Sequence, residues 1–98
     1  MPKPVPTPAP MDNVYELYQN GTRLLEDGDY HAAAVPLARA RDLEPDKTSI
    51  REALGRALQL QGKHHEARKP LALASTLRPE RADYRHYRDR ARRASEAA

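Results

Sequence analysis

Apolar residues recur at helical spacing in the stretch that follows Met11. Between residues 14 and 25 they follow i, i+3, i+4 and i+7 spacing, at Val14, Leu17, Tyr18, Gly21, Leu24 and Leu25. This spacing places all of them on one face of a helix. Asp12 or Asn13 can cap the N-terminus of this helix. We expect the helix to end at Asp27-Gly28-Asp29, where Gly28 can adopt the left-handed conformation of a helix C-terminus.

A second helix is expected from about His31 to Leu43, because Glu44 precedes Pro45 and the residue before a proline disfavours helix. When residues 14–47 are compared with residues 48–81, so that Gly21 falls on Gly55, eleven positions are identical across this one period of 34 residues. The pairs are Gly21/Gly55, Leu24/Leu58, Gly28/Gly62, His31/His65, Ala33/Ala67, Pro36/Pro70, Leu37/Leu71, Ala38/Ala72, Ala40/Ala74, Leu43/Leu77 and Pro45/Pro79. A period of 34 residues (55 − 21) indicates a helical repeat whose unit is a pair of helices.

The glycines among the identical residues also indicate how the helices pack and turn. Gly21 and Gly55 fall within predicted helices, where glycine costs about 1 kcal/mol relative to alanine. A repeated glycine at this place indicates that a neighbouring helix approaches closely. Gly28 and Gly62 fall at the predicted turns between the helices of each pair.

The pattern resembles the tetratricopeptide repeat, over residues 14–81. The positions that carry the resemblance are Leu17, Gly21, Leu24, Ala33, Leu37, Ala40 and Pro45, and then Arg51, Gly55, Leu58, Ala67, Leu71, Ala74 and Pro79. Only Arg51 departs clearly, since the family has a large apolar residue there. The resemblance implies an all-α fold, a right-handed helical-repeat solenoid with units at residues 11–47 and 48–81.

Residues 82–94 are expected to form a capping helix, within a last segment of residues 82–98. Its inward face would carry Tyr84, Tyr87, Ala91 and Ala94, and its solvated face Arg85, Arg88, Arg92 and Arg93. Asp89 stands where the units have Gly21 and Gly55. A helix that receives no further neighbour needs no glycine at that place, and terminal repeats require a solvated outer face.

Residues 1–10 have a proline at every second position from Pro2 to Pro10. Neither a helix nor a central strand tolerates this spacing, so an extended, polyproline-like tail is expected. We favour a solvated spacer over a ligand for an aromatic groove, because no PxxP motif with a flanking basic residue stands out.

The composition of the chain excludes several kinds of site and segment. The chain has no Cys, so it has neither disulfides nor thiolate metal sites. It begins without the apolar stretch of a secretory signal and has no run of about 20 apolar residues, so we expect a soluble, cytoplasmic protein. Arg outnumbers Lys thirteen to four, a bias typical of a GC-rich bacterial genome.

Positive charge gathers near the C-terminus. Between residues 78 and 93, seven Arg stand against Glu80, Asp83 and Asp89, and 7 − 3 gives a net charge of +4. Such a basic end favours acidic proteins or nucleic acid as partners.

No arrangement of residues typical of catalysis is present. The Ser and Thr residues have no Gly-rich elbow around them, and the four histidines form no i, i+4 pair. We therefore expect no enzymatic activity, no metal site and no cofactor.

The resemblance to the tetratricopeptide repeat implies instead a concave peptide-binding groove, lined by the first helix of each unit. The corresponding residues are Tyr15, Tyr18, Thr22, Leu25, Ser49, Glu52, Arg56, Gln59, His86, Arg90 and Arg93. Tyr and Arg are enriched at interface hot spots, and Arg can bind a carboxylate in a bidentate manner. The leading hypothesis is thus an adaptor or small regulatory subunit that binds an acidic peptide or helix of another protein.

Two alternatives remain open. The Arg-rich C-terminal helix could bind nucleic acid through its phosphates, with a steep dependence on salt. The chain could also self-assemble, for instance as a homodimer, because repeat proteins usually need about three units for stability and this chain has two and a half.

Overall fold

The computed structural model of the chain describes residues 13–97, and these residues are entirely helical apart from the connections. The helices are α1 (Val14–Glu26), α2 (Tyr30–Leu43), α3 (Thr48–Leu60), α4 (His64–Leu77) and α5 (Ala82–Ala97). The prediction of an all-α fold is confirmed for this part of the chain. The last helix continues to Ala97, beyond its predicted end at residue 94. The predicted Pro-rich tail of residues 1–10 and the predicted cap Asp12 lie outside the described residues.

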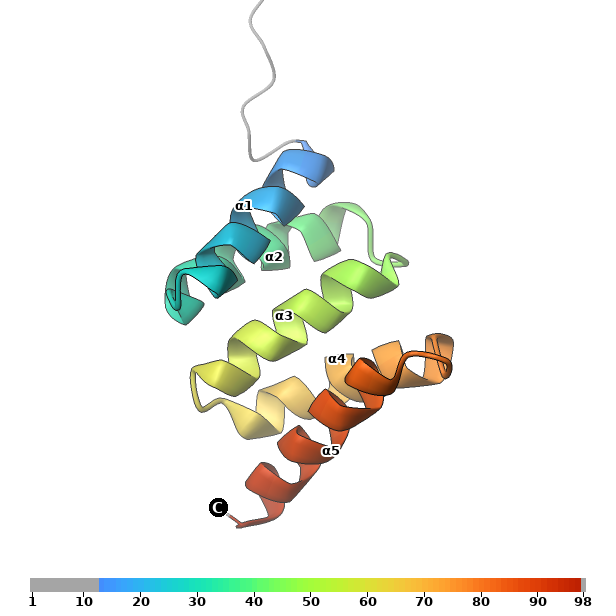
Figure 1. Ribbon diagram of the computed structural model, residues 1–98. Coiled ribbons are helices and arrows are strands. Elements are labelled where there is room, and N and C mark those ends of the chain that lie inside the picture. The colour runs from blue at the N-terminus through green and yellow to red at the C-terminus, as the bar shows by residue number, and fades with distance from the viewer. Residues whose placement is uncertain (1–12, 98) are drawn as a thin grey trace, which may run out of the picture.

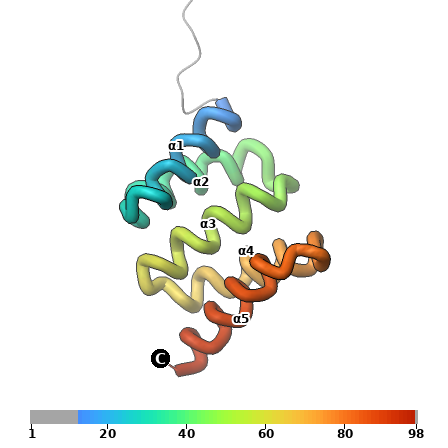
Figure 2. Tube along the Cα trace, viewed as in Figure 1, coloured from blue at the N-terminus to red at the C-terminus, as the bar shows by residue number. Residues whose placement is uncertain are grey.

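The five helices lie in two layers. In Figure 1, α1, α3 and α5 form a front layer in which they follow one another down the molecule, and α2 and α4 lie behind them. Helices that are neighbours along the chain pack against each other, and α3 also contacts α1 and α5 within its own layer. The tube in Figure 2 shows the chain passing from one layer to the other at each connection.

The turns that join α1 to α2 and α3 to α4 have the same geometry. Gly28 has φ +82° and Gly62 has φ +89°, which confirms the predicted left-handed glycines. The backbone hydrogen bonds that close the first turn recur at the matching positions of the second. They run from Gly28 to Leu25 (3.1 Å) and from Asp29 to Leu24 (2.9 Å), and then from Gly62 to Gln59 (3.0 Å) and from Lys63 to Leu58 (2.9 Å).

The mid-helix glycines lie under a leucine of the helix that follows. A Cβ atom on Gly21 would lie 2.4 Å from Cγ of Leu37, and one on Gly55 would lie 2.7 Å from Cγ of Leu71. Both distances are far below van der Waals contact, and both leucines are fully buried. The predicted close approach of a neighbouring helix at these glycines is therefore confirmed.

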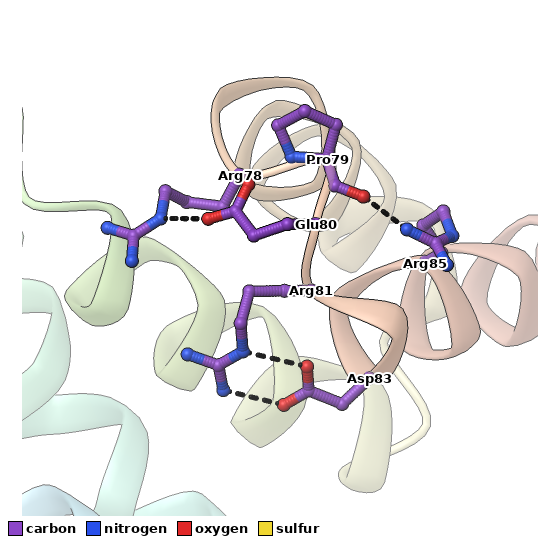
Figure 3. A network of polar contacts seen from close by, with 6 residues as sticks. All are labelled: Arg78, Pro79, Glu80, Arg81, Asp83 and Arg85. Carbon is purple, nitrogen blue, oxygen red and sulfur yellow. Dashed lines mark hydrogen bonds and ion pairs between the residues drawn. The ribbon is translucent and has the colours of Figure 1, made fainter.

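The connections before α3 and α5 share a further contact. The side chain of Arg51 donates a hydrogen bond from Nε to the carbonyl oxygen of Pro45, at 2.5 Å. Arg85, at the matching position of the next repeat, donates to the carbonyl oxygen of Pro79 (Figure 3). Arg51 was the one clear departure from the repeat pattern, and its side chain satisfies a loop carbonyl instead of filling the core.

The start of α1 is capped as expected. The side chain of Asn13 accepts a hydrogen bond from the backbone N–H of Glu16 at 3.2 Å. The residue at the same place before α3 is Lys47, which makes no side-chain hydrogen bond to the helix. None of the helices of residues 13–97 is both long and apolar enough to cross a membrane.

Candidate functional site

The front layer has a hollow between α1 and α3, of about 390 Å³, which we call the Tyr18 hollow. Its lining residues come from α1, α2 and α3 and are Tyr18, Thr22, Leu25, Glu26, Tyr30, Arg56 and Leu60. The structure thus brings together four predicted site residues, Tyr18, Thr22, Leu25 and Arg56. Tyr30 was missed, because it is the first residue of α2 and the family pattern places the groove on the first helix of each unit.

A second, smaller hollow of about 230 Å³ adjoins the first and is called the Tyr15 hollow. It is lined by Val14, Tyr15, Tyr18, Glu44, Lys47, Ser49 and Ile50. Tyr18 lines both hollows, so the two form one uneven surface between α1 and α3. Tyr15 is 67% exposed, and its hydroxyl accepts a hydrogen bond from the Gln19 side chain at 2.8 Å.

Arg56, at the edge of the Tyr18 hollow, is already paired. Its Nε lies 2.7 Å from a carboxylate oxygen of Glu52, which is only 5% exposed. Nε has no hydrogen-bond acceptor among the described residues, so the contact with Glu52 is classed as an ion pair. The guanidinium also lies 5.3 Å from the centre of the Tyr87 ring. Much of the positive charge of Arg56 is therefore balanced by the carboxylate of Glu52.

Glu52 lines neither hollow, although the sequence places it in the groove. Burial raises the pKa of its carboxyl, and the neighbouring Arg56 opposes this shift. Asp83 on α5 adds a smaller, raising effect on the pKa. Glu52 is therefore a buried acid of α3 with Arg56 and Asp83 as charged neighbours.

The first turn of α5 is held by a second ion pair (Figure 3). Arg81 makes two hydrogen bonds to the carboxylate of Asp83, at 3.0 and 2.8 Å, and its guanidinium lies 4.4 Å from the centre of the Tyr84 ring. The hydrogen bond from Arg81 lowers the pKa of Asp83, and burial raises the pKa of Tyr84. These contacts are local and order the start of α5.

The remaining predicted residues are not gathered at the hollows. His86, Arg90 and Arg93 are exposed on α5 and line neither the Tyr18 nor the Tyr15 hollow. Among the described residues, Arg90 and Arg93 have no ion-pair partner. Gln59 is half-buried, and its side-chain oxygen lies 2.9 Å from Nδ1 of His64. The role of these residues in a groove stays a prediction.

Arg88 differs from the expectation for α5. The sequence predicts it on the solvated face, but its side chain is half-buried and donates a hydrogen bond to the Ser75 hydroxyl at 2.9 Å. The reason is that α4 presents the buried Ser75 opposite it, which periodicity within α5 alone cannot reveal.

In residues 13–97, no three His, Cys, Asp or Glu side chains are grouped so that they could hold a metal ion. Comparisons of the chain with protein-family models, with curated proteins and with solved structures find no match in any of the three.

Proposed function

We propose that the chain is a small, tetratricopeptide-like repeat protein that holds a segment of another protein on the surface between α1 and α3. In this proposal, two helix pairs and the capping helix α5 form a short right-handed solenoid. The support is that three independent features recur at matching repeat positions: the left-handed glycine turns, the glycine-leucine contacts and the arginine bonds to Pro45 and Pro79.

The observation that carries the binding proposal is the position of the tyrosines. Tyr18 lines both hollows, and Tyr15, which lines the Tyr15 hollow, is largely exposed. An exposed aromatic ring next to a hollow is typical of interface hot spots, because the ring contributes a large contact area with few rotatable bonds. A partner would place an apolar side chain in the Tyr18 hollow and cover Tyr15.

The charge of the partner follows from the arginines that remain unpaired. Arg56 is neutralised by Glu52, whereas Arg90 and Arg93 on α5 have no carboxylate partner among the described residues. An acidic stretch that extends from the tyrosines toward α5 would pair with these two arginines. The proposal is of a cytoplasmic binding protein without a cofactor or a catalytic step.

The proposal can be tested by selecting peptides from a random library displayed on phage against the immobilised chain. We expect enriched sequences to combine an aromatic or large aliphatic residue with Asp or Glu. The variant Tyr15→Ala should weaken the best peptide by about tenfold or more, which corresponds to a hot-spot loss of over ~1 kcal/mol. The variant R90E/R93E should weaken it by repulsion of the acidic residues.

R23E/R41E is the matched control, because it makes the same change in charge on α1 and α2, at residues that line neither hollow. Arg56→Glu is unsuitable, since it would place two carboxylates together beside the buried Glu52. If Tyr15→Ala leaves the affinity of every selected peptide unchanged, the surface between α1 and α3 is not the binding site. If R23E/R41E weakens binding as much as R90E/R93E does, the arginines act only through net charge.

A further inference from the structure

Another, larger hollow lies between α4 and α5 and shares no lining residue with the Tyr18 hollow or the Tyr15 hollow. It measures about 470 Å³, within the size range of small-ligand sites, and we call it the basic hollow. It is lined by His65, Arg68, Lys69, Ala72, Arg88 and Arg92. The four α4 residues follow i, i+3, i+4 and i+7 spacing, and the two α5 residues follow i, i+4 spacing. Two helices therefore face each other with a row of cationic side chains on each.

The repeat itself does not require charge at this place. The matching residues one repeat earlier lie at the junction of α2 and α3, and there Arg68, Lys69, Arg88 and Arg92 correspond to Ala34, Val35, Leu54 and Leu58. Leu54 is buried in the largest core cluster, and Ala34 and Leu58 pack against it. Three of the four matching residues are thus packed apolar side chains in one unit, and Val35 is apolar but exposed, whereas all four are cations in the next unit.

Two of the cations are held in place by neighbouring polar groups. The buried Ser75 accepts a hydrogen bond from Arg88, and Asp89 lies 3.0 Å from Arg88 and 3.7 Å from Arg92. Arg88 lowers the pKa of Asp89, so this carboxylate stays charged. Arg68 and Lys69 have no carboxylate partner in the part of the chain that the structure describes.

The charge of the basic hollow sets the charge of its ligand. Arg68, Lys69, Arg88 and Arg92 contribute +4, and the adjacent Asp89 contributes −1, so 4 − 1 leaves +3 without counting His65. One phosphate group carries about −1.5 to −2 near neutral pH, so two adjacent phosphates match the hollow better than one. Arginines on opposite walls can each bind phosphate oxygens in a bidentate manner.

We propose that the basic hollow binds a compact anion with two or more adjacent phosphate groups. The ligand is a short oligophosphate rather than a nucleic acid strand, because the lining includes no Tyr or other large aromatic side chain on which bases would stack. This site is separate from the surface between α1 and α3 and does not depend on the function proposed for that surface.

The test is a calorimetric titration of the full chain with sodium tripolyphosphate, without divalent cations, at low and at moderate salt. We expect one site per chain, with an affinity that falls as salt rises because the contacts are ionic. The variant R68E/K69E should bind at least about tenfold more weakly, since two attractive contacts become repulsive. Both residues are on the α4 surface, and an unchanged melting temperature would show that the variant folds.

R23E/R41E is again the matched control and should change the affinity less than about threefold, through net charge alone. Equal weakening in the two variants would overturn the proposal, and so would the absence of any binding of tripolyphosphate at low salt. A single-stranded oligothymidine serves as the third probe. If it binds through the same arginines but far more tightly than tripolyphosphate, the hollow is part of a nucleic-acid surface and the assignment of a compact ligand is wrong.

Discussion

The junction of α2 with α3 and the junction of α4 with α5 are built on one backbone plan but filled differently. In the first junction Leu54 is buried among apolar neighbours. In the second, Arg88 takes the corresponding place and bonds to Ser75, and the space beside it remains open as the basic hollow. The repeated residues thus hold the helices together, whereas the residues that change between units give each surface its chemistry.

The largest effect is expected where the two units are alike. Leu37→Ala and Leu71→Ala each remove a fully buried side chain and should each lower the free energy of unfolding by about 2–5 kcal/mol. Equilibrium unfolding in urea measures both values. Val35→Ala is the control, because Val35 is 72% exposed and its loss should stay within about 0.5 kcal/mol. A small loss for Leu71→Ala alone would mean that the second unit is packed less tightly than the first.

The glycine-leucine contact can be tested in the same way. Gly55→Ala should lower the free energy of unfolding by about 1–3 kcal/mol, because the added Cβ collides with Leu71, although alanine is the better helix former. In a Leu71→Ala background the same substitution should cost much less, since the collision is gone. A double-mutant cycle without coupling between residues 55 and 71 would contradict the close approach.

The difference between the two junctions can be removed by substitution. In the double variant Ser75→Ala with Arg88→Leu, residue 88 carries the leucine that the first junction has at Leu54, and the substitution at residue 75 avoids an unpaired buried hydroxyl. We expect this variant to raise the free energy of unfolding by about 1 kcal/mol, because replacement of a polar pair by packed apolar side chains is often stabilising. The same variant should bind tripolyphosphate more weakly. A loss of stability above about 1 kcal/mol would show that the hydrogen bond between Arg88 and Ser75 is itself a major support of the junction.

The first helices of the two units, α1 and α3, differ in the capping of their N-termini, and this difference has a smaller effect on stability. Asn13→Ala should cost about 1 kcal/mol because α1 loses its cap, and Lys47→Asn should add about 0.5–1 kcal/mol by giving α3 the same cap. Urea unfolding measures both changes. The comparison between units would fail if Lys47→Asn were destabilising, since that would mean that the chain at residue 47 cannot adopt the geometry found at Asn13.

The smallest effect concerns the pH dependence of stability through Glu52. Because burial raises its pKa above the ordinary value of 4.5, the folded chain binds this proton more tightly than the unfolded chain does. The contribution of Glu52 to stability is therefore largest below pH 4.5 and declines as the pH rises through the raised value. The difference in unfolding free energy between Glu52→Gln and the unaltered chain should thus shift in favour of the variant from pH 4.5 to 7. A difference that stays constant with pH would contradict the raised pKa.

The helices, their turns and the close contacts that repeat follow from the amino-acid sequence alone. Apolar spacing, Asn13 and Gly28 encode the helices and turns through local hydrogen bonding and allowed φ angles. The repeated glycines and leucines mark where the two helices of each pair approach closely. The clustering of Tyr15, Tyr18 and Ser49 was also accessible, because the repeat period relates α1 to α3.

Which charged side chains are free depends on the packing of the helices. Glu52 and Arg56 are both predicted on a groove, but only Arg56 lines a hollow, and the buried Glu52 binds it in an ion pair. Arg88, predicted on the solvated face, instead donates a hydrogen bond to the buried Ser75. A long side chain can reach several partners, and the residue that it contacts depends on which side chains the neighbouring helix places opposite it. These contacts join segments that are distant in the chain, so the pattern of residues within one helix does not predict them.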